Sequence, residues 1–316
     1  MNPHDLLQQL PPLQAPPWLK GGHAQTLYAK ALQSPPPAYR RELLPDSYGE
    51  DLAAYDFVDA ADPDAPLVVL FHGLEGSSTS HYAVELMHRV RAHGWHGVVA
   101  HFRSCGGVAS KRLYHSGDTR EAAHMLALLA QRYRRIYAVG VSLGGNVLAK
   151  YLGEQGSAAL PAAAATVSSP LDLGAGSRLL ESGLSRLLYT PYFMHTLMGK
   201  VPAGRRRFCR SLAEFDNRYT APLHGFADKD DYYAQSSAKP LLKNIAVPTL
   251  LLNARNDPFV PADSLPTAAD ISPSVCLLQP EHGGHCGFVS GGGRGHLRWL
   301  PDTLLAFFDG LERRRG

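Results

Sequence analysis

Three side chains that lie far apart in the sequence, Ser142, Asp257 and His285, are of the types that together attack a carbonyl carbon. A serine hydroxyl is a poor nucleophile near neutral pH, so it needs a base to take its proton and a third group to orient that base. The chain order serine, acid, histidine is typical of proteins in which the acid and the histidine follow later strands of one sheet. We therefore predict a catalytic Ser-Asp-His triad.

Ser142 lies where an apolar run gives way to a helical pattern. Residues 140–144 read Gly-Val-Ser-Leu-Gly, and apolar residues then recur at helical spacing from position 147 to 152. A strand that feeds a helix through so tight a turn places the central residue in strained geometry, and the residues two before and two after it must be small. Gly140 and Gly144 meet that need, so we expect the hydroxyl of Ser142 to be exposed as a nucleophile.

The acid and the histidine each have a rival nearby. Asp257 follows an apolar run that ends near residue 253, and Asp263, which has the character of a helix-start residue, is the alternative acid. His285 lies in a glycine-rich loop, residues 281–288, where His282 competes with it. We favour His285 because the two glycines before it free the backbone to aim the ring.

The negative charge that grows on a carbonyl oxygen during attack needs preset donors. We expect one donor to be the backbone N–H of Leu143, directly after the nucleophile. The other should be the N–H of Leu74, in the loop at residues 72–76 (His-Gly-Leu-Glu-Gly). A second loop at this edge, residues 103–107, either lines the site or holds Arg103 in a structural ion pair.

Other chemistries are weakly supported. His282, His285 and Cys286 could bind zinc, but they lack the usual ligand spacing and no second pair accompanies them. The glycine-rich residues 290–295 lack the Lys-Ser/Thr of a phosphate-binding loop. We predict no metal and no cofactor.

The rest of the chain alternates between strand and helix patterns. The predicted strands are 40–44, 52–58, 67–71, 96–102, 135–141, 162–168, 249–253 and 274–278, and the predicted helices of the core are 80–92, 118–133, 143–155 and 296–311. The first two strands flank a turn and should form a hairpin at the sheet edge. The alternation that follows predicts a mostly parallel, eight-stranded sheet with helices on both faces.

Two segments depart from this alternation. Residues 1–37 are rich in proline and are predicted to wrap the domain as an irregular arm. Residues 172–240 have helical periodicity without strands, which predicts a helical insertion that forms a lid over the carboxyl edge of the sheet. Residues 38–171 and 241–316 form the predicted core.

Composition and charge limit the classes of partner and the cellular compartment that we expect for this protein. The 316 residues are 45% apolar and 19% charged with a formal net charge of +3, which gives no argument for nucleic acid. The short basic clusters at residues 205–210 and 313–315 are interpreted as solvated surface. The four cysteines form no C-x-x-C, as in a reducing compartment. Neither a signal peptide nor an apolar run of about 20 residues is present, so we expect a cytoplasmic protein with no transmembrane segment.

Together these stretches resemble the YheT-type α/β hydrolases, the family also called AB-hydrolase 4, across nearly the whole chain. The resemblance rests on residues 17–26 (Pro-Trp-Leu-Lys-Gly-Gly-His-Ala-Gln-Thr), 72–76, 102–107, 114–119, 214–220, 224–226, 231–233 and 253–259. It implies an α/β-hydrolase fold with the family's triad on Ser142, Asp257 and His285. It also implies a serine esterase or lipase that hydrolyses short- to medium-chain carboxylic esters, with monoacylglycerols and phospholipids among the candidate substrates.

Two alternatives to hydrolysis share these motifs. Some members of the wider family pass the acyl group to an alcohol instead of water. A catalytically silent hydrolase fold that binds a hydrophobic ligand or a partner protein is the alternative from another class. We expect the partner to be a small ester with an apolar acyl chain.

Overall fold

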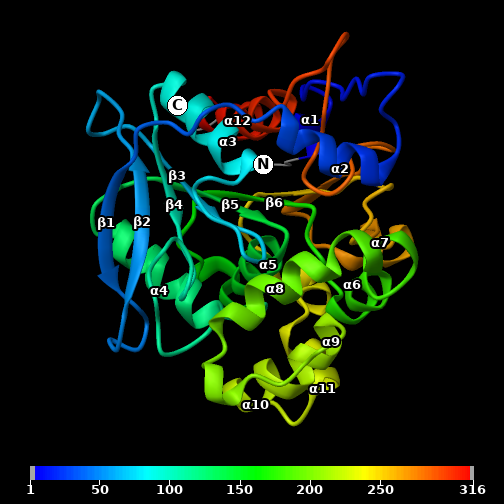
Figure 1. Ribbon diagram of the computed structural model, residues 1–316. Helices are drawn as coiled ribbons and strands as arrows, with labels where there is room; N and C mark the ends of the chain where they lie inside the picture. The colour runs from blue at the N-terminus through cyan, green and yellow to red at the C-terminus, as the bar shows by residue number, and fades with distance from the viewer. Residues whose placement is uncertain (1–3, 314–316) are drawn as a thin grey trace.

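The computed structural model describes residues 4–313, so the first three residues and the last two arginines of the terminal basic cluster lie outside it. Eight strands form one sheet in the order β1-β2-β4-β3-β5-β6-β7-β8 (Figure 1). Their bounds are β1 Arg40–Pro45, β2 Leu52–Val58, β3 Leu67–Phe71, β4 His96–Ala100, β5 Ile136–Val141, β6 Ala163–Val167, β7 Thr249–Leu252 and β8 Val275–Leu278. Along this order, the six strands from β4 to β8, which include β3, are parallel to one another, whereas β2 pairs antiparallel with both β1 and β4. The predicted fold class is confirmed.

The hairpin of β1 and β2 is closed by a side chain. The carboxylate of Asp46 accepts hydrogen bonds from the backbone N–H groups of Tyr48, Glu50 and Asp51 at 3.0–3.3 Å. An aspartate that bonds the backbone a few residues ahead stabilises a tight turn. The hairpin is therefore specified locally, as the sequence predicted.

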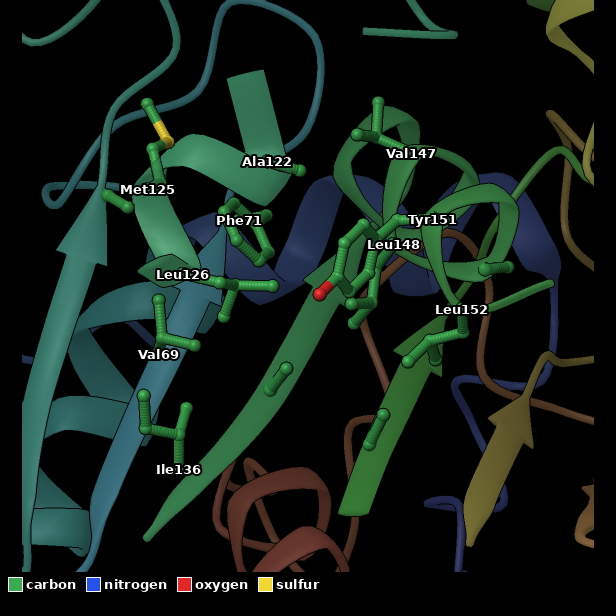
Figure 2. Packing of buried hydrophobic residues seen from close by; sticks show 14 of the residues in the cluster. Val69, Phe71, Ala122, Met125, Leu126, Ile136, Val147, Leu148, Tyr151 and Leu152 are labelled. Carbon is green, nitrogen blue, oxygen red and sulfur yellow. The ribbon is translucent and has the colours of Figure 1, made fainter. Parts of the chain in front are cut away.

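Helices cover both faces of the sheet, with α3 (His81–Ala92) and α12 (Trp299–Glu312) on one and α4 (Thr119–Ala130) and α5 (Leu143–Gln155) on the other (Figure 1). All five residues of β3 are buried. Val69 and Phe71 pack under α4 and α5, as Figure 2 shows, whereas Val68 and Leu70 belong to the opposite core. Because successive side chains of a strand point to opposite faces, a strand buried on both faces must be continuously apolar.

Between β6 and β7 the chain is helical. This insertion comprises α6 Leu173–Leu180, α7 Gly183–Leu188, α8 Thr190–Lys200, α9 Leu212–Phe215, the π-helical turn η3 Asp216–Thr220, α10 Ala221–His224 and α11 Lys229–Ser236. Part of it has a small core of its own, formed by Met194, Leu197, Val201, Cys209, Leu212 and Phe215. The insertion therefore packs partly on itself.

The N-terminal segment contains more regular structure than its composition predicted. Besides the short α1 (His4–Leu7), residues Gly22–Ala31 form the ten-residue helix α2. The prediction of an irregular arm was wrong here because the prolines lie on either side of this stretch and none lies within it. Ala29 of α2 packs with Val289 and Leu297, which fixes the helix against the C-terminal part of the chain.

None of the helices within residues 4–313 combines the length and the apolar character that crossing a membrane would require.

Candidate active site

Ser142 is held in a strained conformation at the junction of β5 and α5. Its φ and ψ angles are 53° and −120°, a region that residues with side chains rarely adopt. A Cβ atom on Gly144 would lie 2.5 Å from the carbonyl oxygen of His72, and one on Gly140 would lie 2.5 Å from the carbonyl oxygen of Gly144. Only glycines fit at both positions, and the turn places Ser142 on the wall of a pocket.

The structure brings Ser142, Asp257 and His285 into one hydrogen-bonded line. Nε2 of His285 lies 3.0 Å from Oγ of Ser142. On the other side of the ring, Nδ1 lies 3.1 and 3.0 Å from the two carboxylate oxygens of Asp257. The backbone N–H of Phe259 donates to Oδ1 of Asp257 at 2.8 Å, which fixes the buried carboxylate. This geometry is suited to activating a serine hydroxyl.

Two opposing effects act on the imidazole of His285. Burial, the largest single effect, disfavours the charged form, but the Asp257 carboxylate and the side chain of Cys286 together outweigh it, so the pKa of His285 lies above its ordinary value. The ring also stacks on Phe259, with centroids 4.0 Å apart and an interplanar angle of 20°. The carboxylate and the phenyl ring together hold the imidazole in one orientation.

The rival residues lie elsewhere. Asp263 is exposed in a short 3₁₀ turn, Ala262–Ser264. His282 does not line the pocket, and its Nδ1 is buried without a hydrogen-bond partner in the described part of the chain. Cys286 is buried, and residues 4–313 contain no group of three or more His, Cys, Asp or Glu side chains arranged to hold a metal ion.

The two residues whose backbone amides are expected to bind the oxyanion both lie at this site. Leu74 and Leu143 line the same pocket as Ser142. A Cβ atom on Gly73 would lie 3.1 Å from Cβ of Ser142, so the loop at residues 72–76 passes directly beside the serine. Neither the N–H of Leu74 nor that of Leu143 has a hydrogen-bond partner within residues 4–313, so both donors are available to a substrate.

Two tyrosines fix the amides on either side of Leu74. The N–H of Gly73 donates to the hydroxyl of Tyr82 at 2.9 Å, and the N–H of Glu75 donates to the hydroxyl of Tyr114 at 2.8 Å. The hydroxyl of Tyr114 in turn donates to Oε1 of Glu75 at 2.8 Å. We call this pair the tyrosine clamp. It was not predicted, because the partner of a tyrosine hydroxyl leaves no local sequence pattern and Tyr114 lies 39 residues from Glu75.

The helix α2 supports the loops that carry the acid and the histidine. Oγ1 of Thr26 accepts a hydrogen bond from the N–H of His285 at 2.8 Å. Nδ2 of Asn256, next to Asp257, donates to the carbonyl oxygen of Lys20 at 2.8 Å. A Cβ atom on Gly22 would collide with the carbonyl oxygen of Asn256. Residues 17–26, which carry part of the family resemblance, therefore lie behind the histidine.

Arg103 does not line the pocket. Its guanidinium is buried and pairs with the carboxylates of Asp118 and Glu121. Of the two interpretations left open by the sequence, the structural ion pair is therefore the one observed. It joins the loop after β4 to the start of α4.

The pocket in front of Ser142 is open to solvent, and its empty space together with the solvent at its mouth amounts to about 1010 Å³. One wall belongs to the sheet edge and the other to the helical insertion, and its apolar side chains include Leu143, Leu173, Leu180, Phe193 and Leu197. Nζ of Lys200, the last residue of α8, lies 2.6 Å from Oε1 of Glu75. The insertion thus contacts the loop that carries the amide of Leu74.

Comparison with known proteins agrees with the fold. Residues 68–294 match the model of the alpha/beta hydrolase family. The Escherichia coli K12 protein YheT, named as a candidate esterase, is 38% identical over 296 residues, which cover 86% of each chain. The human phospholipase ABHD3 is 32% identical over 299 residues, 87% of this chain and 73% of its own. The solved structure of mouse alpha/beta hydrolase domain-containing protein 10 superposes with a TM-score of 0.55 at 16% identity, covering 88% of this chain and 100% of that one.

Proposed function

Because this chain belongs to the alpha/beta hydrolase family, we propose that it is a serine carboxylesterase that works through an acyl-enzyme. The observation that carries the proposal is the unbroken line of hydrogen-bonding distances from Asp257 through His285 to Ser142. That line ends at an apolar pocket large enough for an acyl chain. The names of the relatives, esterase and phospholipase, support the same class of reaction.

In the first half of the proposed reaction, Oγ of Ser142 bonds to the ester carbonyl carbon while Nε2 of His285 takes the hydroxyl proton. Asp257 stabilises the imidazolium that forms. The N–H groups of Leu74 and Leu143 bind the carbonyl oxygen as it becomes negative, and each such donor typically contributes about 3 kcal/mol. When the carbon–oxygen bond to the alcohol breaks, His285 returns its proton to the leaving alcohol.

In the second half, water gives a proton to His285 and its oxygen bonds to the acyl carbon. The bond to Ser142 then breaks, and His285 returns the proton to the serine oxygen, which releases a carboxylic acid. An acyl-enzyme reacts with any nucleophile that reaches it, so the same intermediate would acylate an alcohol that competes with water.

We also propose that residues 172–240 act as a lid that completes an apolar site for short- to medium-chain acyl groups. Leu173, Leu180, Phe193 and Leu197 belong to this insertion and line the pocket in front of Ser142. Their burial of an acyl chain would contribute about 0.8 kcal/mol per methylene group. Activity should therefore rise with acyl length until the pocket is filled.

The proposal is tested by Ser142→Ala, with Ser182→Ala as the control because Ser182 is an exposed serine of the same insertion. Ser142→Ala should lower turnover of p-nitrophenyl butyrate by about 10³-fold or more and abolish labelling by a fluorophosphonate probe. Ser182→Ala should do neither. Near-normal turnover by Ser142→Ala would rule out the assigned nucleophile, and a wild-type protein that does not label would indicate a catalytically silent fold.

Adding ethanol to the same assay separates hydrolysis from acyl transfer. Release of butyric acid alone supports an esterase, whereas ethyl butyrate formed in preference to the acid would identify an acyltransferase that uses the same triad.

A further inference from the structure

The pocket contains a row of polar side chains that the proposed reaction does not use. We call it the polar strip, and it consists of His115, Asp216, His224, Tyr232 and Tyr233, all of which line the pocket with Ser142 and His285. They come from the loop before α4, the turn η3, the end of α10 and the helix α11. Four of the stretches quoted for the family resemblance, residues 114–119, 214–220, 224–226 and 231–233, therefore meet on one wall.

Each member of the polar strip contacts the next one along the wall of the pocket. The rings of His115 and His224 lie 4.4 Å apart, and the ring of His115 lies 5.9 Å from that of Tyr232. Tyr232 and Tyr233 are neighbours with ring centroids 5.3 Å apart, and the hydroxyl of Tyr233 donates to Oδ2 of Asp216 at 2.8 Å. The strip is thus a continuous polar surface on the wall of an otherwise largely apolar pocket.

The strip is joined directly to the helix that follows the serine. Nδ2 of Asn146 donates to the carbonyl oxygen of Ser116 at 2.8 Å, and the N–H of Asn146 donates to the carbonyl oxygen of Ser142 at 3.1 Å. Ser116, the residue next to His115, is therefore linked through Asn146 to the turn that holds Ser142. A substrate attached to Ser142 lies in the same cavity as the strip.

Asp216 is a carboxylate without a cationic partner. Its two oxygens accept hydrogen bonds from Thr220 at 2.7 Å and Tyr233 at 2.8 Å, and no ion pair with it is formed within residues 4–313. Burial raises the pKa of Asp216 to about 6, so it is ionised above neutral pH. With only these two donors, the carboxylate keeps lone pairs that a ligand can use.

The two histidines are neutral donors and acceptors. Burial and the charge of Arg103 lower the pKa of His224 to about 4, and burial lowers the pKa of His115 well below its usual range. Nδ1 of His115 accepts a hydrogen bond from the N–H of Gly117 at 3.2 Å, so its proton resides on Nε2. That N–H has no partner within residues 4–313 and belongs to a side chain that lines the pocket.

The strip therefore offers an anionic acceptor at Asp216 and a neutral donor at His115. A hydrocarbon chain would leave the remaining lone pairs of Asp216 and the N–H of His115 without a partner, and a phosphate or carboxylate would be repelled by Asp216. A hydroxyl group suits either side chain, since it can donate to the carboxylate or accept from the imidazole. Hydroxyl groups of an ester of a fatty acid belong to its alcohol portion.

We propose that the polar strip binds hydroxyl groups of the alcohol portion of the substrate, so that the enzyme prefers esters of polyols to esters of simple alcohols. This inference rests on the proposed function, because it concerns the same pocket. Asp216 and His115 act as specificity-determining residues and take no part in bond breaking.

The test compares glycerol 1-monobutyrate with n-propyl butyrate, which share the acyl group and the three-carbon alcohol skeleton and differ by two hydroxyl groups. For the wild type, kcat/KM should be at least about 10-fold higher for the glycerol ester, the effect of one charge-assisted hydrogen bond. Asp216→Asn should lower kcat/KM for the glycerol ester about 10-fold more than for the propyl ester. Asp263→Asn, an exposed aspartate outside the pocket, is the matched control and should preserve the preference.

A second measurement does not depend on turnover. In Ser142→Ala, the glycerol ester should raise the melting temperature more than the same concentration of the propyl ester, and the difference should vanish when Asp216→Asn is added. Equal kcat/KM for the two esters in the wild type, or an equal loss for both in Asp216→Asn, would overturn the proposal. A higher kcat/KM for butyrylcholine than for the glycerol ester would instead identify a cation site. If the wild type hydrolysed neither ester but the difference in melting temperature remained, the proposed function would be wrong and hydroxyl binding by the polar strip would still be supported.

Discussion

Replacing Tyr114 with phenylalanine tests whether the position of the Leu74 amide limits the rate. The substitution removes the hydroxyl that accepts from the N–H of Glu75 and donates to its carboxylate, both at 2.8 Å. The ring itself should stay in place, because it is buried and stacks on Phe102 with centroids 5.6 Å apart and an interplanar angle of 6°. The variant therefore isolates the hydroxyl of the tyrosine clamp from the packing of its ring.

The expected loss in kcat depends on the contacts that still hold the loop around Leu74 in the variant. Complete loss of one oxyanion donor costs about 10²- to 10³-fold in kcat. In Tyr114→Phe the hydroxyl of Tyr82 still holds Gly73 and the amine of Lys200 still contacts Glu75, so the amide of Leu74 is misplaced only in part. We expect kcat to fall by about 10- to 100-fold, which corresponds to about 1.4 to 2.7 kcal/mol, with KM little changed. The unpaired N–H of Glu75 should also lower the free energy of unfolding by about 1–3 kcal/mol.

The assay measures kcat and KM with p-nitrophenyl butyrate together with the inhibition constant of a trifluoromethyl ketone, which forms an oxyanion on serine. The inhibition constant should rise in parallel with the loss in kcat. Tyr151→Phe is the matched control, since the hydroxyl of Tyr151 also accepts from a backbone N–H, that of Leu160 at 3.2 Å. Neither Tyr151 nor Leu160 lines the pocket. A folded Tyr114→Phe variant that loses no more kcat than Tyr151→Phe would refute the role given to the clamp.

Three further predictions follow from the site. In the proposed mechanism neutral His285 is the base, and the Asp257 carboxylate raises its pKa, so kcat/KM should rise with pH through an apparent pKa above 6.5. Asp257→Asn should lower both that pKa and kcat, the latter by about 10⁴-fold, and an unchanged pH profile would contradict the assignment. Gly144→Ala should lower the free energy of unfolding in denaturant melts by at least about 4 kcal/mol, because its Cβ would meet backbone atoms. The control Gly199→Ala, with open space around its Cβ, should raise the free energy of unfolding by about 0.5–1 kcal/mol. Equal effects of the two substitutions would refute the steric argument. Thr26→Val should lower kcat about 10-fold in a folded protein by removing the acceptor for the N–H of His285, and full activity would show that this support is dispensable.

The sheet was predictable because its signals are local. The run Leu67–Phe71 is apolar at every position, and each of its residues is buried in the structure. Such continuity arises only when both faces of a strand are covered, so the helices on both faces followed from the strands. The turn at Ser142 was likewise legible, because the glycines two residues before and after it are required by the backbone itself.

Features that depend on distant contacts left no local pattern. The hydrogen bond that the N–H of His285 donates to Thr26 and the clamp of Tyr114 on Glu75 join positions far apart in the chain. A threonine or tyrosine is an ordinary surface or core residue until its partner is known, so no spacing rule could select these side chains. The helix α2 was missed for a different reason, since prolines on either side of Gly22–Ala31 suggested irregular structure while the intervening residues form a regular helix.

The support from α2 also explains how a glycine-rich loop can hold the imidazole of His285 in one position. Gly284 has a φ of 60°, and glycines in such a loop leave the unfolded backbone many conformations to lose. A Cβ atom on Gly284 would lie 2.5 Å from the carbonyl oxygen of Gly22, so the loop and α2 touch backbone to backbone. The same glycine that makes the loop flexible in isolation therefore permits the close contact that makes it rigid in the folded protein. The position of His285 depends on a helix near the other end of the chain, and any change that displaces α2 should impair catalysis before it unfolds the sheet.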